Sequence, residues 1–169
     1  EDIKNFVSSV KEVGDIHAVL HTVGSFAVRP PHAMNKEAFE AVISTNLTSA
    51  FLTLSIVGKA MLGQGHGRMV FTSSVAGSLG LVNHEAISAA KGGIEAMVRS
   101  AAATYANRGI RVNAVAPGLT NTKLASPIMS NETASQAASQ KIPIKRVGEK
   151  EEIASVIKWL LAEAPDNFT

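Results

Sequence analysis

The 169-residue chain contains no cysteine, only one tryptophan and one tyrosine, and no large excess of charge of either sign. Without cysteine, neither a disulfide framework nor a thiolate metal site can form. The formal net charge is only +2 and the basic residues are scattered, which argues against binding to nucleic acid or to an anionic membrane surface. No uninterrupted apolar run approaches the ~18 residues that a membrane-spanning helix needs. We therefore expect neither a nucleic-acid partner nor a membrane partner.

The start of the chain, Glu1-Asp2-Ile3-Lys4, shows no initiator methionine and no signal-peptide pattern. Because the lack of cysteine also fits a reducing compartment, we expect a cytoplasmic protein. The five histidines have no metal-ligand spacing such as His-Glu-x-x-His, so we expect no metal site. A hydrophobic content of 46% with 18% charged residues is typical of a globular protein and predicts one domain over residues 1–169.

Apolar residues recur with helical spacing in segments that alternate with short, continuous apolar runs. Helices are expected near the N-terminus, ending at Gly14, and then over residues 36–62, 86–107 and 149–163. Strands are expected over residues 16–23, 69–72 and 110–116, and residues 119–148 are expected to be irregular. This alternation predicts an α/β fold with a doubly wound, Rossmann-like parallel sheet that is covered by helices on both faces.

Three motifs between Arg68 and Gly118 carry the most information in the chain. They read Thr72-Ser73-Ser74-Val75-Ala76-Gly77, then Ile87-Ser88-Ala89-Ala90-Lys91, then Asn113-Ala114-Val115-Ala116-Pro117-Gly118. Together they resemble the catalytic half of the short-chain dehydrogenase/reductase family. In that family a serine precedes a tyrosine by thirteen positions, and a lysine follows the tyrosine by four. Ser74 and Lys91 stand at the serine and lysine places, whereas Ile87 stands at the tyrosine place.

The resemblance implies an oxidoreductase that transfers a hydride between NAD or NADP and a small-molecule carbonyl or alcohol substrate. It also implies three catalytic positions. Asn46 would tie the lysine into a chain of water molecules, Lys91 would hold the nicotinamide ribose and lower the pKa of the tyrosine, and Ser74 would hydrogen-bond the substrate carbonyl. The physical logic is general acid catalysis, in which a neighbouring cation brings the pKa of the acid near the working pH.

The same resemblance implies a set of cofactor contacts. The Asn-Asn-Ala-Gly motif of the family is represented here by His21-Thr22-Val23-Gly24, in which only Gly24 is kept, where the backbone passes close to the adenosine ribose. Thr122 falls where the family places a threonine against the cofactor. The other implied cofactor contacts are Lys91, Pro117, Gly118 and Leu119. Residues 119–148 are expected to form a lid over the substrate.

Ile87 departs from the family pattern in a way that bears on activity, because an alkyl side chain has no proton to give. His84, three positions earlier, is the only titratable group near enough in sequence to serve as a substitute acid, and it reads better as a loop histidine beside a helix start. The only tyrosine, Tyr105, lies eighteen positions beyond Ile87, or roughly 27 Å along the same helix. We therefore expect catalysis to be impaired or absent.

The glycine-rich turn with which such enzymes begin, Gly-x-x-x-Gly-x-Gly, is not found in the chain, and relatives continue beyond Thr169 into a final strand. We expect the Rossmann-like domain to be incomplete in its N-terminal half and at its last strand. Three hypotheses stay open: an enzyme, a non-catalytic relative that binds nucleotide or oligomerises, and a truncated or decayed reading frame. Neither the substrate nor the choice between NAD and NADP follows from the sequence.

Relatives assemble into homodimers and homotetramers through two long helices, which here correspond to residues 36–62 and 86–107. Small residues on the outer face of the second helix, such as Ala96, Ser100 and Ala103, would allow close packing of two copies. We expect a homodimer or homotetramer of this kind.

Two other motifs are weaker. Gly63-x-Gly65-x-Gly67 follows a helix and precedes a strand, the reverse of the order that a phosphate-binding loop needs, so it is read as a linker. Ser88-Ala89-Ala90-Lys91 matches the Ser-x-x-Lys of penicillin-recognising acyl hydrolases, but the accompanying Ser-Asp-Asn and Lys-Thr-Gly elements are absent.

Overall fold

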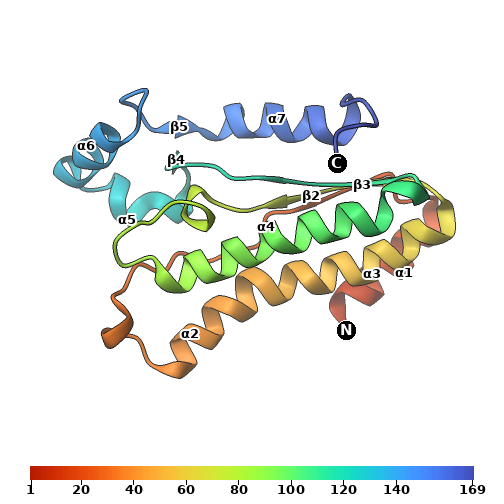
Figure 1. The fold of residues 1–169 in the computed structure, drawn as a ribbon, viewed down its shortest axis with the longest axis horizontal. Helices are drawn as coiled ribbons and strands as arrows, with labels where there is room; N and C mark the ends of the chain where they lie inside the picture. The colour runs from red at the N-terminus through yellow and green to blue at the C-terminus, as the bar shows by residue number, and fades with distance from the viewer.

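The computed structural model describes residues 1–169 and is built around a parallel three-stranded sheet of order β1-β2-β3 (Figure 1). The strands are β1 (Ala18–His21), β2 (Gly67–Thr72) and β3 (Ile110–Val115). His21 pairs with Phe71 and Thr72 pairs with Val115, so all three strands end at nearly the same level. The first strand is shorter than the predicted 16–23, while the other two lie within a residue or two of the predicted ranges.

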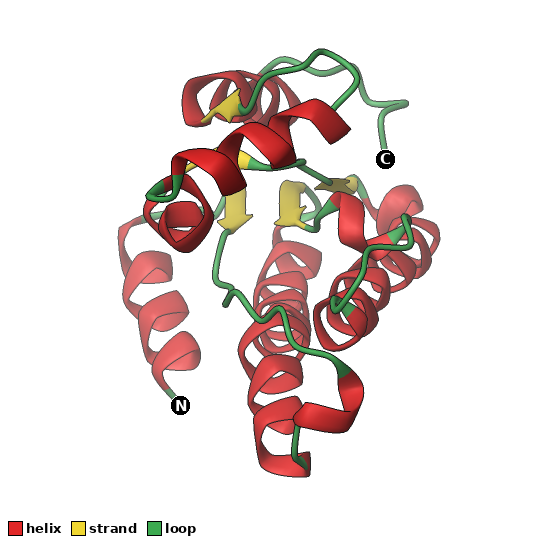
Figure 2. Ribbon diagram, turned by 90° about the vertical axis from the view of Figure 1, so that its left-hand side faces the viewer, coloured by secondary structure: helices red, strands yellow, loops and turns green.

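Helices cover both faces of this sheet, as the alternation of apolar segments predicts (Figures 1 and 2). One face carries α1 (Asp2–Val13), α3 (Ser49–Gln64) and α4 (Glu85–Tyr105), and the other carries α7 (Lys150–Ala162). The doubly wound α/β arrangement is therefore confirmed.

Alternation along β2 explains why one strand serves two cores. Met69 and Phe71 are fully buried in the larger cluster with residues of α3, α4 and β3, such as Met61, Ile94 and Ile110. Val70, between them, points to the other face and packs against Ile157 and Leu160 of α7. Because side chains alternate across a strand, a continuous apolar run is what a sheet covered on both sides requires.

The predicted long helix 36–62 consists of α2 (Lys36–Ile43), a π-helical turn (Ser44–Thr48) and α3. The helix continues through Gly63, ends at Gln64 and is capped by Gly65, whose φ of 80° is left-handed, so the predicted end at residue 62 is wrong by two residues. By length and apolar composition, Lys36–Gln64 would also suffice to cross a membrane. Its buried residues, however, pack into the core against the sheet, as those of a core helix do.

The expectation of an irregular segment at 119–148 is wrong in part. It contains two short paired strands, β4 (Thr120–Asn121) and β5 (Gly148–Glu149), and two helices, α5 (Ser126–Met129) and α6 (Glu132–Lys141). The Asn131 side chain caps α6 by accepting a hydrogen bond from the Ala134 amide at 2.9 Å. Small residues without an apolar stripe hid this helix from a periodicity argument, although alanine and a capping asparagine favour it.

Candidate active site

The carboxyl ends of the three strands form the place where an α/β sheet binds its ligand. β1 ends at His21, β2 ends at Thr72 and is followed by Ser73 and Ser74, and β3 ends at Val115 and is followed by Ala116 and Pro117. Helices α5 and α6 lie at this same end of the molecule (Figure 1). The Ser73 amide donates to the Val115 carbonyl at 2.7 Å, and the Val75 amide donates to the Pro117 carbonyl at 3.0 Å, so the segments after β2 and β3 stay side by side.

Lys91 brings a buried cation to this end of the sheet. The side chain projects from α4, the residue is only 8% exposed, and the ammonium donates a hydrogen bond to the Thr72 carbonyl at 2.8 Å. Burial lowers the pKa of Lys91, because desolvation disfavours its charged form. An ammonium has three donors, so two remain for a ligand.

Asn46 lies in the π-helical turn and is completely buried. Its amide nitrogen donates to the Val42 carbonyl and to the Ser25 hydroxyl, both at 2.9 Å, and its oxygen accepts from the Ser25 amide at 3.2 Å. These bonds tie the turn to the loop that follows β1.

Gly24 completes this group, because its backbone passes close to the Asn46 and Lys91 side chains. A Cβ added to Gly24 would lie 3.0 Å from Asn46 Oδ1 and 3.5 Å from Lys91 Nζ. The structure therefore brings Gly24, Asn46 and Lys91 together, and the Lys91 ammonium has free donors there. A ribose hydroxyl of NAD or NADP could accept hydrogen bonds from these donors.

Ser74 follows β2 in extended backbone, with φ −164° and ψ 153°. Its Oγ accepts a hydrogen bond from the Ala76 amide at 3.2 Å. Because the oxygen acts here as an acceptor, the hydroxyl proton stays available for a substrate oxygen.

Ile87, at the tyrosine position of the family pattern, packs among apolar side chains. The side chain is 7% exposed and lies in a small apolar cluster with Val42 of α2, Ala76 of the turn after β2, and Ala86 and Ala90 of α4. An isoleucine held in this way can contribute shape and a dry environment to the site, but no proton.

The two other candidate acids make contacts of their own at the two ends of α4. His84 precedes α4, and its Nδ1 lies 2.7 Å from the Val82 carbonyl, so this nitrogen donates within its own turn. Tyr105 ends α4 and packs against α3, where its hydroxyl lies 3.2 Å from the position of a Cβ on Gly58.

The remaining predicted cofactor residues follow β3. The Pro117 carbonyl accepts from Val75, and the Leu119 carbonyl accepts from the Gly148 amide at 3.0 Å, while a Cβ on Gly118 would meet nothing within 4 Å. Thr122 is exposed, and its hydroxyl donates to the Thr120 carbonyl at 3.4 Å, within its own turn. Pro117 therefore lies beside the segment after β2, whereas the Thr122 hydroxyl bonds only within its own turn.

Sequence reasoning missed His21 as a site residue. It is 4% exposed, and its Nε2 lies 3.0 Å from the Ser49 hydroxyl of α3. Burial lowers the pKa of His21, and the charge of Lys91 lowers it further. His21 could have been found from the sequence, because it lies near the carboxyl end of a predicted strand and α/β sheets bind their ligands at the carboxyl ends of the strands.

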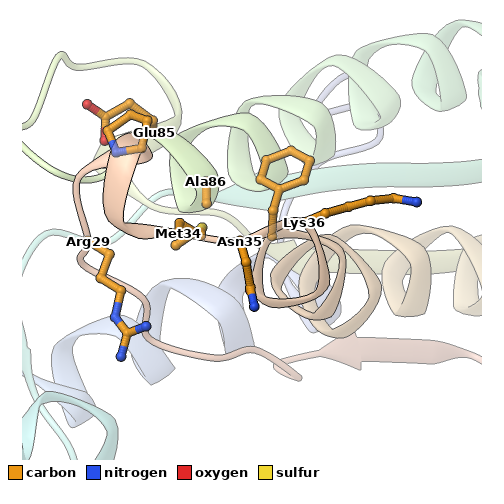
Figure 3. A pocket seen from close by; sticks show the side chains of 8 residues that line it. Arg29, Met34, Asn35, Lys36, Glu85 and Ala86 are labelled. Atoms are coloured by element: carbon orange, nitrogen blue, oxygen red, sulfur yellow. The ribbon is translucent and has the colours of Figure 1, made fainter.

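A pocket of about 310 Å³ opens between the loop after β1, the start of α2 and the start of α4 (Figure 3). Its lining includes Arg29, Met34, Phe39 and Glu85. The Arg29 and Lys36 side chains extend away from one another in Figure 3, so the two cations form no joint anion site.

Comparisons with known proteins agree with this geometry. The family described as enoyl-(acyl carrier protein) reductase matches residues 1–169. A cis-4-hydroxycyclohexanecarboxylate dehydrogenase from Sinomonas cyclohexanicum is 37% identical over 154 residues, which are 90% of this chain and 61% of that protein.

Two solved structures extend the comparison. A short-chain type dehydrogenase/reductase from Mycobacterium ulcerans superimposes with a TM-score of 0.93 at 27% identity, covering 99% of this chain and 62% of the other. NAD+-bound xylitol dehydrogenase gives a TM-score of 0.89 at 30% identity, covering 99% of this chain and 70% of the other. With Ser74 and Lys91 in their family positions on this fold, the chain belongs to the short-chain dehydrogenase/reductase family of oxidoreductases.

Proposed function

We propose that this chain is the central and catalytic part of an NAD(P)-dependent oxidoreductase acting on a carbonyl or alcohol substrate, and that Ile87 impairs its catalysis. The observation that carries the proposal is the convergence of Gly24, Asn46 and Lys91 at the carboxyl ends of the strands. The dehydrogenases to which the chain is similar support the reaction class. A cysteine-free sequence agrees with a reaction in the cytoplasm.

Cofactor and protein residues would have different roles in the proposed reaction. When bound, the nicotinamide supplies or accepts the hydride. Lys91 donates hydrogen bonds to ribose hydroxyls from the two ammonium hydrogens that Thr72 leaves free. Ser74 donates its hydroxyl proton in a hydrogen bond to the substrate oxygen and so polarises the carbonyl.

The proton that must reach or leave the substrate oxygen has no dedicated donor or acceptor. A positioned general acid contributes roughly 10²- to 10⁴-fold in rate, so we expect a loss of that order with isoleucine at position 87. Residues 119–148, which contain α5 and α6, are proposed as the substrate lid because these helices lie beyond the carboxyl ends of the strands (Figure 1).

A non-catalytic relative that oligomerises is the second candidate, and two observations favour it. Ile87 is packed into an apolar cluster, and the helices α3 and α4 have exposed outer faces. The α4 face presents Ala96, Ser100 and Ala103, and α3 exposes Phe51 to 55%. Association through these faces is proposed for either candidate function.

Titration of the chain with NADH and with NADPH, followed by nicotinamide fluorescence, tests the proposed cofactor site. We expect saturable binding below about 1 mM, or roughly 4 kcal/mol or more of binding free energy. Lys91→Met keeps the length of the side chain and removes its charge, so it should weaken binding by about 10-fold or more. Lys158→Met, on the exposed side of α7, is the matched control. Absence of binding at millimolar cofactor would contradict the proposal.

A further inference from the structure

A carboxylate ties the turn after β2 to α4, and no step of the proposed chemistry uses it. Glu95 lies four residues after Lys91, so the two side chains project from the same face of the helix. Its Oε1 accepts a hydrogen bond from Ser73 Oγ at 2.8 Å, and its Oε2 accepts one from Ser78 Oγ at 2.7 Å. One carboxylate thus holds both ends of the segment 73–78, which contains Ser74.

Ser73 links this carboxylate to the backbone of Lys91. It is 3% exposed, and its single hydroxyl proton faces Glu95 Oε1 and also the Lys91 carbonyl, which lies 3.1 Å away. The charged acceptor is the nearer and the stronger of the two. Without the carboxylate, the hydroxyl keeps only the longer bond to the helix backbone.

The segment also lies directly on α4, with no space for a side chain between them. A Cβ on Gly77 would lie 2.7 Å from Glu95 Oε1 and 3.0 Å from the Gly92 amide nitrogen. A Cβ on Gly92 would lie 3.1 Å from the Gly77 carbonyl oxygen. By contrast, a Cβ on Gly80, just past the segment, would meet nothing within 4 Å.

We propose that Glu95 is a positioning residue, which sets the Ser74 hydroxyl relative to Lys91 by holding the segment 73–78 on α4. The inference rests on the proposed function, because Ser74 has a catalytic role only there. Glu95 acts through the segment, since the Ser74 carbonyl and hydroxyl bond to the Gly77 and Ala76 amides at 2.8 and 3.2 Å.

Amide hydrogen exchange of the full chain, followed by NMR without cofactor or substrate, tests this directly. In Glu95→Ala, we expect the Gly77 amide to exchange roughly 10-fold faster or more, because bonds to a charged acceptor that close the segment are lost. The 13Cε resonance of Lys91 should shift as well. Gly77→Ala should likewise speed exchange of the amide at position 77 and shift the Lys91 resonance. Two controls should change neither quantity: Gly80→Ala, and Glu12→Ala on the exposed face of α1.

Two milder variants keep the test decisive if Glu95→Ala does not fold. Glu95→Gln retains one accepting oxygen and should restore much of the protection of the Gly77 amide. Ser78→Ala removes one of the two bonds from an exposed position and should give an intermediate rate.

The proposal is overturned if these variants leave the Gly77 amide and the Lys91 resonance unchanged. It is also overturned if exchange rises equally throughout the chain, which would show loss of global stability alone. Failure of NADH and NADPH to bind would instead contradict the proposed function. The exchange rates would still report on how Glu95 holds the segment 73–78.

Discussion

At the scale of single residues, the candidate site depends on buried polar groups whose partners come from distant parts of the chain. Asn46 bonds to Ser25 of the loop after β1, and Lys91 bonds to Thr72 of β2. Buried polar groups are expensive unless they are satisfied, so each of these residues links local stability to the geometry of the site.

Asn46→Ala should lower the free energy of unfolding by about 2–4 kcal/mol, because it leaves the Ser25 amide and hydroxyl and the Val42 carbonyl without their partner. Urea unfolding followed by tryptophan fluorescence measures the loss. Asn131→Ala removes an exposed helix cap of α6 and serves as the control, with an expected cost of about 1 kcal/mol. Equal losses in the two variants would speak against the role of Asn46.

His21 should make stability fall with acid. Its pKa in the folded protein lies below 6.5, chiefly because it is buried. As the pH falls through 6.5 the unfolded chain therefore takes up a proton that the folded chain does not, and stability that is complete above this pH is lost below it. In His21→Asn, the difference in unfolding free energy between about pH 7.5 and about pH 5.5 should shrink. An unchanged difference would contradict this assignment.

At the scale of elements, apolar spacing predicted the three strands and the long helices because both periodicities are local properties of the chain. The π-helical turn at Ser44–Thr48 and the contact of Glu95 with Ser73 and Ser78 could not be predicted in this way. The Glu95 contacts depend on how segments 17 and 22 residues apart in the sequence meet in space. The family motif located Ser74 and Lys91, yet it gave no hint of His21, which replaces an asparagine of the motif.

Two glycines of the helix ends should respond in opposite ways to alanine. Gly109 ends the region after α4 at a φ of 75°, and a Cβ there would meet the Gly65 carbonyl oxygen, so Gly109→Ala should destabilise the chain by about 2 kcal/mol or more. Gly63 lies inside α3 with nothing within 4 Å of its Cβ position, so Gly63→Ala should stabilise by about 0.5–1 kcal/mol. Thermal unfolding of both variants tests this prediction. Midpoint temperatures that shift in the same direction would contradict it.

At the scale of the whole molecule, we propose a homodimer or homotetramer that associates through the exposed faces of α3 and α4. Ala103→Glu places a charge on the outer face of α4 and should shift the mass measured by light scattering toward the monomer. Ala137→Glu, on the exposed side of α6, is the matched control and should leave the mass unchanged. A monomeric mass of the unmodified chain would exclude this assembly.

The central claim is that an oxidoreductase site remains at the carboxyl ends of the strands, and that isoleucine at position 87 deprives this site of its proton donor. The most direct measurement compares Ile87→Tyr with Ile87→Phe in the full-length protein, by NADH and NADPH consumption with ketones and aldehydes. Both variants place a ring in the same apolar cluster, and only the first adds a hydroxyl. We predict that Ile87→Tyr raises turnover by about 10²- to 10⁴-fold over both Ile87→Phe and the unmodified protein. Turnover no higher in Ile87→Tyr than in Ile87→Phe would contradict the claim.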